Sequence, residues 1–366
     1  MTAFNIKRRK TRRIHVGPVP VGGGAPIAVQ SMTNTDTSDV AATVAQIDRL
    51  QEAGCEIVRV AVPDMDAAEA IAAIKKQIRI PLIADVHFNW RLAVAALEAG
   101  ADGLRINPGN IGGRDKTCKV IARAKEKGVP IRIGVNAGSV EKDLLKKHGG
   151  PTAAAMAESV FRNIAIFEAA GFDNIKISVK ASDVHRTVAC YRLVAEQCDY
   201  PLHVGVTEAG GLVPGLVKSS VGIGLLLADG IGDTIRVSLT RDPVEEVRAG
   251  FEILKALDIR RVGPEIISCP TCGRCRIDLF SIAEAVERSL MKMRAPFTVA
   301  VMGCAVNGPG EAKGADVGIA GGDGAGVLFK KGRIVKTMPE DKLVEALLKE
   351  AQRLEKQWRR KSDKKE

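Results

Sequence analysis

The sequence predicts an α/β protein in which a TIM (β/α)8 barrel is followed by a smaller α+β domain. Three observations support this prediction: eight short β-branched runs, helical segments between them, and a change of sequence character after about residue 261. Successive strand candidates are mostly about thirty residues apart, the length of one βα unit. Eight such units over roughly 250 residues fit a TIM barrel better than a doubly wound sheet, which has fewer strands.

The strand candidates are rich in Val and Ile, and turn residues lie between them and the helices. They cover residues 26–33, 56–63, 81–88, 103–108, 130–136, 174–180, 201–208 and 233–239. The intervening segments have apolar residues at the three-and-four spacing of an amphipathic helix, and several end at a glycine. The clearest are residues 39–54, 89–100, 152–171 and 242–257. The long gap after residue 136 contains NAGSVEKDLLKKHGGP, which we interpret as a lid loop.

We place the domain boundary so that residues 1–262 form the barrel and residues 263–366 form the second domain. The second domain is expected to contain a helix, a strand, a glycine-rich stretch, a hairpin, and a charged amphipathic helix before a basic tail. In order, the first four of these cover residues 281–293, 297–303, 306–322 and 324–336, and the tail is WRRKSDKKE.

The net charge of +11 indicates an anionic partner, which could be a nucleic acid, a phosphorylated metabolite or an acidic protein. Only 4% of the residues are aromatic, which argues against a stacking platform for single-stranded nucleic acid. We find no apolar run of membrane-spanning length and no secretory signal, so we expect a cytoplasmic protein that does not bind membranes. Eight cysteines in such a chain favour metal or redox chemistry over disulfides.

Several barrel strands carry polar residues where a parallel strand, buried on both faces, should be apolar. These residues lie two apart near the carboxyl ends of the strands, where TIM barrels build their active sites. They are Arg59, Asp85, His87, Arg105, Asn107, Arg132, Asn136, Lys176, Ser178, Lys180, Glu208, Arg236 and Ser238. The five cations Arg59, Arg105, Arg132, Lys180 and Arg236 could together hold a diphosphate. The alternative explanation is that one face of each strand is exposed to solvent, as in an antiparallel sheet. A solvated face, however, gives no reason for five strands to carry their cations near the same end.

The motif CPTCGRC places Cys269, Cys272 and Cys275 so that their thiolates can face one point from a tight turn. A ferredoxin-type run would have a fourth cysteine at position 279, which is a leucine. The remaining ligands must come from further along the chain, and Cys304 and Glu311 are the candidates.

Three kinds of cysteine site are compatible with this spacing. A redox-active CxxC would need a thioredoxin-like βαβ context, and a structural zinc site usually needs a second ligand pair. We favour an iron–sulfur cluster that is held by three thiolates and one carboxylate. A substrate oxygen could displace the carboxylate from the iron. A basic zinc-ribbon protein bound to nucleic acid would explain the charge and the CxxC, but not the ordered barrel cations. A third possible function is that of a barrel enzyme in which zinc has only a structural role.

Eight motifs, in order and along almost the whole chain, resemble the bacterial IspG (GcpE) family. They are QSMTNTDT, VRVAVP, DVHFN, RINPGN, IRIGVNAGS, SVKASD, SCPTCGRC and GCAVNGPGEA. This family comprises 4-hydroxy-3-methylbut-2-en-1-yl diphosphate synthases of the methylerythritol phosphate route to isoprenoids. The resemblance implies a TIM barrel followed by a [4Fe–4S] domain. It also implies reductive ring opening and dehydroxylation of 2-C-methyl-D-erythritol 2,4-cyclodiphosphate.

The resemblance also assigns residue roles and partners. It implies cluster ligands at Cys269, Cys272, Cys304 and Glu311, and acidic residues beside the reacting carbons at Asp85 and Glu208. It implies diphosphate binding by Arg59, His87, Arg105, Asn107, Arg132, Asn136, Lys180, Arg236 and Ser238. Glu208, with Asp85 and His87 nearby, is the candidate for proton handling. The expected partners are flavodoxin or ferredoxin as electron donor and a second subunit in a head-to-tail homodimer, with no nucleic acid. Cys275 lies outside the implied ligand set.

Overall fold

The computed structural model describes residues 6–304, 310, 312–322 and 324–362. By its internal contacts the chain divides into two compact units, Met1–Arg260 and Arg261–Glu366. Within the described residues, none of the helices combines the length and the apolar composition needed to cross a bilayer.

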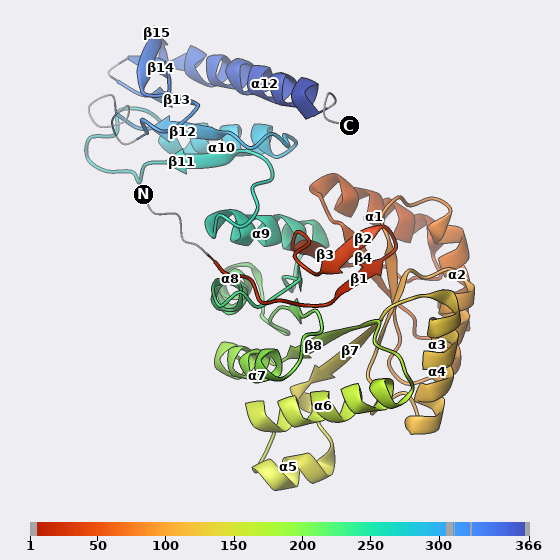
Figure 1. The fold of residues 1–366 in the computed structure, drawn as a ribbon. Helices are drawn as coiled ribbons and strands as arrows, with labels where there is room; N and C mark the ends of the chain where they lie inside the picture. The colour runs from red at the N-terminus through yellow and green to blue at the C-terminus, as the bar shows by residue number, and fades with distance from the viewer. Residues whose placement is uncertain (1–5, 305–309, 311, 323, 363–366) are drawn as a thin grey trace. The chain divides into compact units, whose positions relative to one another are not determined.

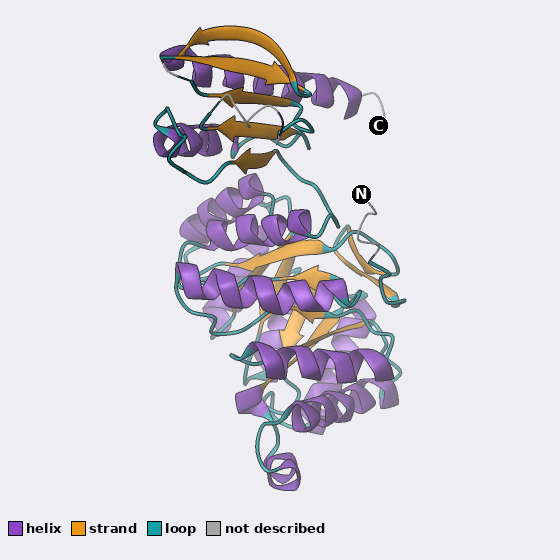
Figure 2. Ribbon diagram, turned by 90° about the vertical axis from the view of Figure 1, so that its left-hand side faces the viewer, coloured by secondary structure: helices purple, strands orange, loops and turns teal. Residues whose placement is uncertain are grey.

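The first unit is a parallel barrel with its helices outside the strands (Figures 1 and 2). Its strands are β3 (Ala28–Met32), β4 (Ile57–Ala61), β5 (Leu82–Asp85), β6 (Gly103–Ile106), β7 (Ile131–Asn136), β8 (Ile175–Lys180), β9 (His203–Val204) and β10 (Thr234–Ile235). They pair in the order β8-β7-β6-β5-β4-β3-β10-β9, and a parallel bridge between Ile177 and Leu202 joins β8 to β9. The predicted TIM barrel is therefore confirmed, and all eight strand candidates contribute a strand to it.

The helices begin where side chains can accept the free N–H groups of the first turn. Asp39, Asn89, Thr152 and Asp242 cap four of them in this way, and these four correspond to the clearest helical segments of the sequence. The barrel helices are α1 (Val40–Ala53), α2 (Met65–Lys75), α3 (Trp90–Glu98), α4 (Arg114–Lys127), α5 (Lys142–His148), α6 (Ala153–Ala169), α7 (Val184–Gln197), α8 (Leu212–Ala228) and α9 (Pro243–Ala256).

An antiparallel hairpin that the sequence analysis did not predict precedes the barrel. Its strands are β1 (Arg13–Val16) and β2 (Val19–Gly22). Val16 and Val21 pack in one cluster with Ile57 and Ile83, which lie at the amino ends of β4 and β5. The hairpin therefore packs against the amino end of the barrel and leaves the carboxyl end uncovered by it.

The interpretation of residues 136–151 as a lid loop is wrong in its local structure. The segment contains a short 3₁₀ helix (Ala137–Ser139) and helix α5, which lies beside α6 (Figure 1). Leu144 of α5 is fully buried, and Lys147 and His148 both contact Glu158 of α6 through side-chain hydrogen bonds. These contacts attach the segment to the outer helical layer.

In its described residues, the second unit contains a five-stranded mixed sheet and the helices α10 (Leu279–Leu290) and α12 (Leu343–Ser362). Its strands β11 (Glu265–Ser268), β12 (Thr298–Met302), β13 (Val317–Ala320), β14 (Ala325–Lys330) and β15 (Arg333–Pro339) pair in chain order. The first three run parallel, and β14 and β15 add antiparallel. Helices α10 and α12 share one hydrophobic cluster on the sheet. Three details differ from prediction: β11 was not predicted as a strand, β13 lies inside the glycine-rich stretch, and α12 includes the first part of the basic tail.

Candidate active site

Five cations from the barrel strands gather in one cluster. Arg59 lies on β4, Arg105 on β6, Arg132 on β7 and Lys180 at the end of β8, while Arg236 directly follows β10. All but Arg236 are at most 9% exposed, and the Arg236 side chain is 17% exposed. The strand alternation predicted this grouping, because residues two apart on a strand point the same way.

Asp85, at the end of β5, lies among these cations. Its Oδ1 accepts a hydrogen bond from Arg105 Nη1 at 3.0 Å, and its Oδ2 lies 3.4 Å from Arg59 Nε. Burial by itself would raise the pKa of Asp85, but the charges of Arg59 and Arg105 hold it well below its usual range. Asp85 is therefore ionised at neutral pH, which makes it a poor proton donor and a good anchor for the two guanidinium groups.

His87 lies at the rim of this cluster, with its side chain 49% exposed. Its Nε2 lies 2.7 Å from Arg105 Nη1 and 3.4 Å from Asp85 Oδ1. Because a guanidinium can only donate, Nε2 must accept from Arg105 in the shorter contact. A neutral ring with this contact carries its proton on Nδ1.

The positive charges of the cluster act strongly on one another. Burial, followed by the charges of Arg132, Arg236, Arg59 and Arg105, lowers the pKa of Lys180 well below its ordinary value. Burial lowers the pKa of Arg59 to about 10, with Asp85 opposing the shift. Two buried acidic side chains, Asp85 and Glu246, against five cations leave a concentrated positive field, which an anion of several charges would relieve.

Several N–H groups of the cluster have no acceptor among the described residues. They are Nε and Nη1 of Arg132 and Nε of Arg105. A Cβ at Gly134 would lie 2.7 Å from Arg105 Nε, and one at Gly205 would lie 2.8 Å from Lys180 Nζ. The glycines therefore leave room for the cations, whose free N–H groups can receive the oxygens of a phosphorylated ligand.

Glu246 of α9 and Met32 of β3 also shape the site, although the sequence analysis did not select either. Glu246 is buried; it accepts from Leu239 N at 2.9 Å and from Ser31 Oγ at 3.1 Å, and it lies 3.4 Å from Arg236 Nη2. Met32 Sδ accepts from Arg59 Nη2 at 2.9 Å. Glu246 lies on a helix, so it does not belong to the two-residue pattern of the strands. That pattern could therefore not identify it as a site residue.

The remaining predicted residues lie at the ends of strands β6, β7, β9 and β10. Asn107 is buried and accepts from Gly109 N at 3.1 Å, while Asn136 and Ser238 are half-buried. Glu208 is exposed and has a φ of 53°, an unusual backbone conformation for a residue with a side chain. Such conformations cluster at functional sites.

The cysteine motif of the second unit is joined to the end of strand β12. Cys269 follows β11 and Cys304 follows β12 after one residue, and these strands are parallel, so their carboxyl ends lie at one edge of the sheet. Gly303 N donates to Cys269 Sγ at 3.1 Å, and Cys275 Sγ would lie 2.6 Å from a Cβ at Gly303. Cys272 is exposed at the turn between them.

This arrangement fits an iron–sulfur cluster in its donor chemistry. The soft thiolates suit iron, and the N–H of Gly303 donates to a sulfur, as is common around such clusters. Within the described ranges, no three His, Cys, Asp or Glu side chains already lie at metal-binding separations. Glu311, the predicted fourth ligand, lies outside the described residues.

Fold and site together define a TIM-barrel enzyme for a phosphorylated substrate, joined to a domain with a cysteine-rich loop. Residues 11–251 match the model of the GcpE TIM-barrel domain, and residues 265–353 match that of the GcpE protein C-terminal domain. The chain belongs to the GcpE family, as the motifs indicated.

Two relatives are similar over almost their whole length, and both are named 4-hydroxy-3-methylbut-2-en-1-yl diphosphate synthase (flavodoxin). The protein of Desulfotalea psychrophila is 60% identical over 97% of this chain and 99% of its own. That of Geobacter sulfurreducens is 62% identical over 95% of this chain and 98% of its own. Among solved structures, dihydropteroate synthase from Xanthomonas albilineans is a remote likeness: it is 16% identical with a TM-score of 0.47, over 67% of this chain and 97% of that one. The zinc-ribbon alternative finds no support in these matches.

Proposed function

We propose that this protein is a 4-hydroxy-3-methylbut-2-en-1-yl diphosphate synthase. The reaction opens 2-C-methyl-D-erythritol 2,4-cyclodiphosphate and removes its C3 oxygen as water, consuming two electrons and two protons. The observation that carries the proposal is the ring of buried cations with N–H groups left unpartnered among the described residues, on a chain 60% identical to a relative of that name. A diphosphate is the ligand that such a ring suits best.

The barrel residues bind the diphosphate and stabilise it as a leaving group. Arg105, Arg132 and Lys180 offset the charge that develops on the phosphate oxygens when the ring opens. Asp85, held ionised, keeps Arg59 and Arg105 in place. Proton handling therefore falls to Glu208, which is exposed, and to His87, whose side chain is 49% exposed at the rim.

We assign the predicted cluster ligands to Cys269, Cys272, Cys304 and Glu311. A bound [4Fe–4S] cluster would supply the electrons one at a time. Cys304→Ser should remove most of the iron and acid-labile sulfide from protein purified without air. Cys118→Ser, which changes a half-buried cysteine of α4, is the matched control and should retain both. Loss of iron from both variants would contradict the ligand assignment.

Flavodoxin is the electron donor that the relatives' names support, with ferredoxin as the other candidate. The net charge of +11 favours an acidic carrier by electrostatic steering. Salt should therefore slow electron transfer from reduced flavodoxin. A rate independent of ionic strength would contradict this steering. We also assign the protein to the cytoplasm.

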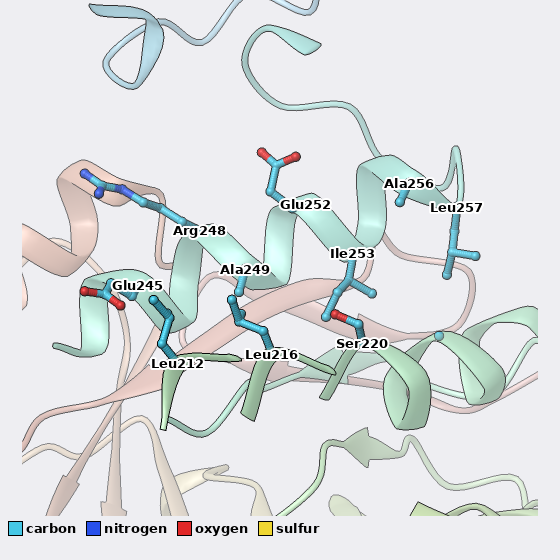
Figure 3. A pocket seen from close by; sticks show the side chains of 11 residues that line it. Leu212, Leu216, Ser220, Glu245, Arg248, Ala249, Glu252, Ile253, Ala256 and Leu257 are labelled. Carbon is cyan, nitrogen blue, oxygen red and sulfur yellow. The ribbon is translucent and has the colours of Figure 1, made fainter. Parts of the chain in front are cut away.

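We also propose the expected head-to-tail homodimer, and an exposed apolar stripe on α8 supports contact with a second copy. Val213, Val217, Val221 and Leu225 follow one another at four-residue spacing and are 44–70% exposed. Beside the stripe, α8 and α9 enclose a groove of about 620 Å³ lined by apolar side chains such as Leu212 and Leu216 (Figure 3). A second copy would cover this surface. Light scattering should give a dimer for the wild type and a monomer for Val217→Glu; a monomeric wild type would contradict the proposal.

The direct test is turnover without air. Protein with reduced flavodoxin and the cyclodiphosphate should form the linear diphosphate, measured by mass spectrometry. Arg132→Met should raise KM at least tenfold and leave the visible spectrum intact. Arg123→Met, an arginine of α4 that binds Glu98 outside the barrel, is the control and should be indistinguishable from wild type. An unchanged KM in Arg132→Met would contradict the diphosphate site.

A further inference from the structure

A buried histidine lies beneath the cation ring and has no part in the site described so far. His203, on β9, is fully buried in the barrel. Its Nε2 lies 3.4 Å from Nζ of Lys180, and its Nδ1 lies 2.8 Å from Oγ1 of Thr234 on β10. Lys180, His203 and Thr234 therefore form a chain of hydrogen-bonding groups across strands β8, β9 and β10.

The chemistry of the three groups determines where the protons are. When Lys180 is charged, its ammonium group can only donate, so Nε2 of His203 accepts from it. The ring must then carry its proton on Nδ1, which donates to the hydroxyl oxygen of Thr234. Burial and the nearby positive charges, Lys180 first, lower the pKa of His203 well below its ordinary value, in agreement with a neutral ring.

Strands β8 and β9 are weakly paired at this place, which makes a side-chain link valuable. Their ladder consists of the single bridge between Ile177 and Leu202. Tyr191 of α7 joins them further along: its hydroxyl donates to the carbonyl of His203 and accepts from Val179 N at 3.2 Å. Val179 directly precedes Lys180, so these hydrogen bonds fix the position of His203 relative to Lys180.

We propose that His203, oriented by Thr234, is a positioning residue that keeps Lys180 charged and aimed at the diphosphate. The inference rests on the proposed function, since it takes the ligand of Lys180 to be a diphosphate. Lys180 needs such support because the charges that act on it are positive. They are Arg132 on β7, Arg236 after β10, Arg59 on β4 and Arg105 on β6, and Lys176 on β8 adds a further positive charge that acts on His203.

The effect of losing His203 depends on pH in a defined direction. An acceptor at Nε2 favours the protonated form of Lys180, so its removal lowers the pKa of that lysine. Lys180 then loses its charge, and with it the diphosphate, at a lower pH than in the wild type. At sufficiently low pH both proteins carry the charge, and their affinities should converge.

The probe is inorganic pyrophosphate, because its binding needs neither electrons nor an intact cluster. Calorimetric titration of the full-length protein between about pH 6 and pH 9 compares wild type, His203→Leu and His203→Gln. In His203→Leu, affinity at the alkaline end should fall roughly ten- to hundredfold, as expected for a lost hydrogen bond to a charged group. The alkaline fall in binding should also move down by about one pH unit. His203→Gln, whose amide oxygen can replace Nε2, should restore most of the affinity.

Two further variants keep the test decisive if His203→Leu folds poorly. Thr234→Val preserves shape and removes the acceptor of Nδ1–H, so it should weaken binding in the same pH-dependent way. Adding His203→Leu to Lys180→Met should cause no further loss, because the two side chains act as one unit. Equal weakening at all pH values, or full additivity in the double variant, would overturn the inference. A wild type that does not bind pyrophosphate would overturn the proposed function as well.

Discussion

Lys176→Met should stabilise the protein, although it removes a charge from the barrel. Lys176 lies on β8, its side chain is 2% exposed, and its Nζ has no hydrogen-bond partner among the described residues. Burial, followed by the charge of Arg132, lowers its pKa from 10.5 to about 7, with Asp233 opposing the shift. The folded state therefore disfavours a charge that the unfolded chain carries freely.

The size and sign of the effect follow from proton linkage. At about 1.36 kcal/mol per pH unit, the pKa difference corresponds to at most about 5 kcal/mol. Because the pKa is lower in the folded state, this destabilisation is fully present below about pH 7. It disappears as the pH rises towards 10.5, where the unfolded chain also loses the proton. Methionine has a similar length and no charge, so Lys176→Met should gain roughly 2–4 kcal/mol at pH 6 after relaxation of the wild type is allowed for.

The assay is denaturant unfolding of the barrel, followed by circular dichroism at pH 6, 8 and 10. The advantage of Lys176→Met over wild type should be largest at pH 6 and should shrink at pH 10. Lys146→Met, which changes an exposed lysine of α5, is the matched control and should show no pH-dependent gain. Destabilisation of Lys176→Met by the same amount at every pH would refute the reasoning, because it would mean that the lysine is favourably paired.

Three further changes test the geometry of the site. Gly134→Ala places a Cβ 2.7 Å from Arg105 Nε, so KM for the cyclodiphosphate should rise about tenfold while the unfolding midpoint changes little; an unchanged KM would show that Arg105 has room to move. Glu246→Gln removes the carboxylate that accepts from Ser31 and Leu239, and unfolding should become easier by about 1–3 kcal/mol; equal stability would contradict its anchoring role. Asp85→Asn should weaken pyrophosphate binding at all pH values from 5 to 9, since the lowered pKa of Asp85 keeps it ionised throughout. If the wild type alone lost pyrophosphate affinity at acid pH, this prediction would be contradicted.

The helices and strands could be predicted from the sequence where the signal is local. Asp39, Asn89, Thr152 and Asp242 each stand directly before an apolar periodic segment, and each caps a helix. The hairpin β1–β2 was missed because its short strands begin within a basic run. Its stability comes from packing on Ile57 and Ile83, which are distant in sequence.

The candidate site was predictable to the extent that strands build it. Arg105 and Arg132 lie on neighbouring strands in register, and the two-residue period of the sequence indicated which way they face. Glu246 reaches the site from a helix and His203 lies deeper in the barrel, so neither produces a pattern in the sequence. Only the paired positions of β8, β9 and β10 show that His203 meets Lys180.

Parallel strand pairing also explains how the cysteines of the second unit come together. The pairing of β11 with β12 brings Cys269 to Gly303, the residue before Cys304. The sequence analysis could not derive this pairing, because it did not recognise β11 as a strand. Its inference that the remaining ligands come from further along the chain rested instead on the leucine at position 279.

The most direct test of the account is electron stoichiometry in a single air-free preparation. Reduced flavodoxin, the cyclodiphosphate and the protein are mixed, and the electrons consumed are compared with the linear diphosphate formed. The account predicts two electrons for each product molecule, and no product without the reductant. Product formed in the absence of reductant, or flavodoxin oxidised without product, would contradict it.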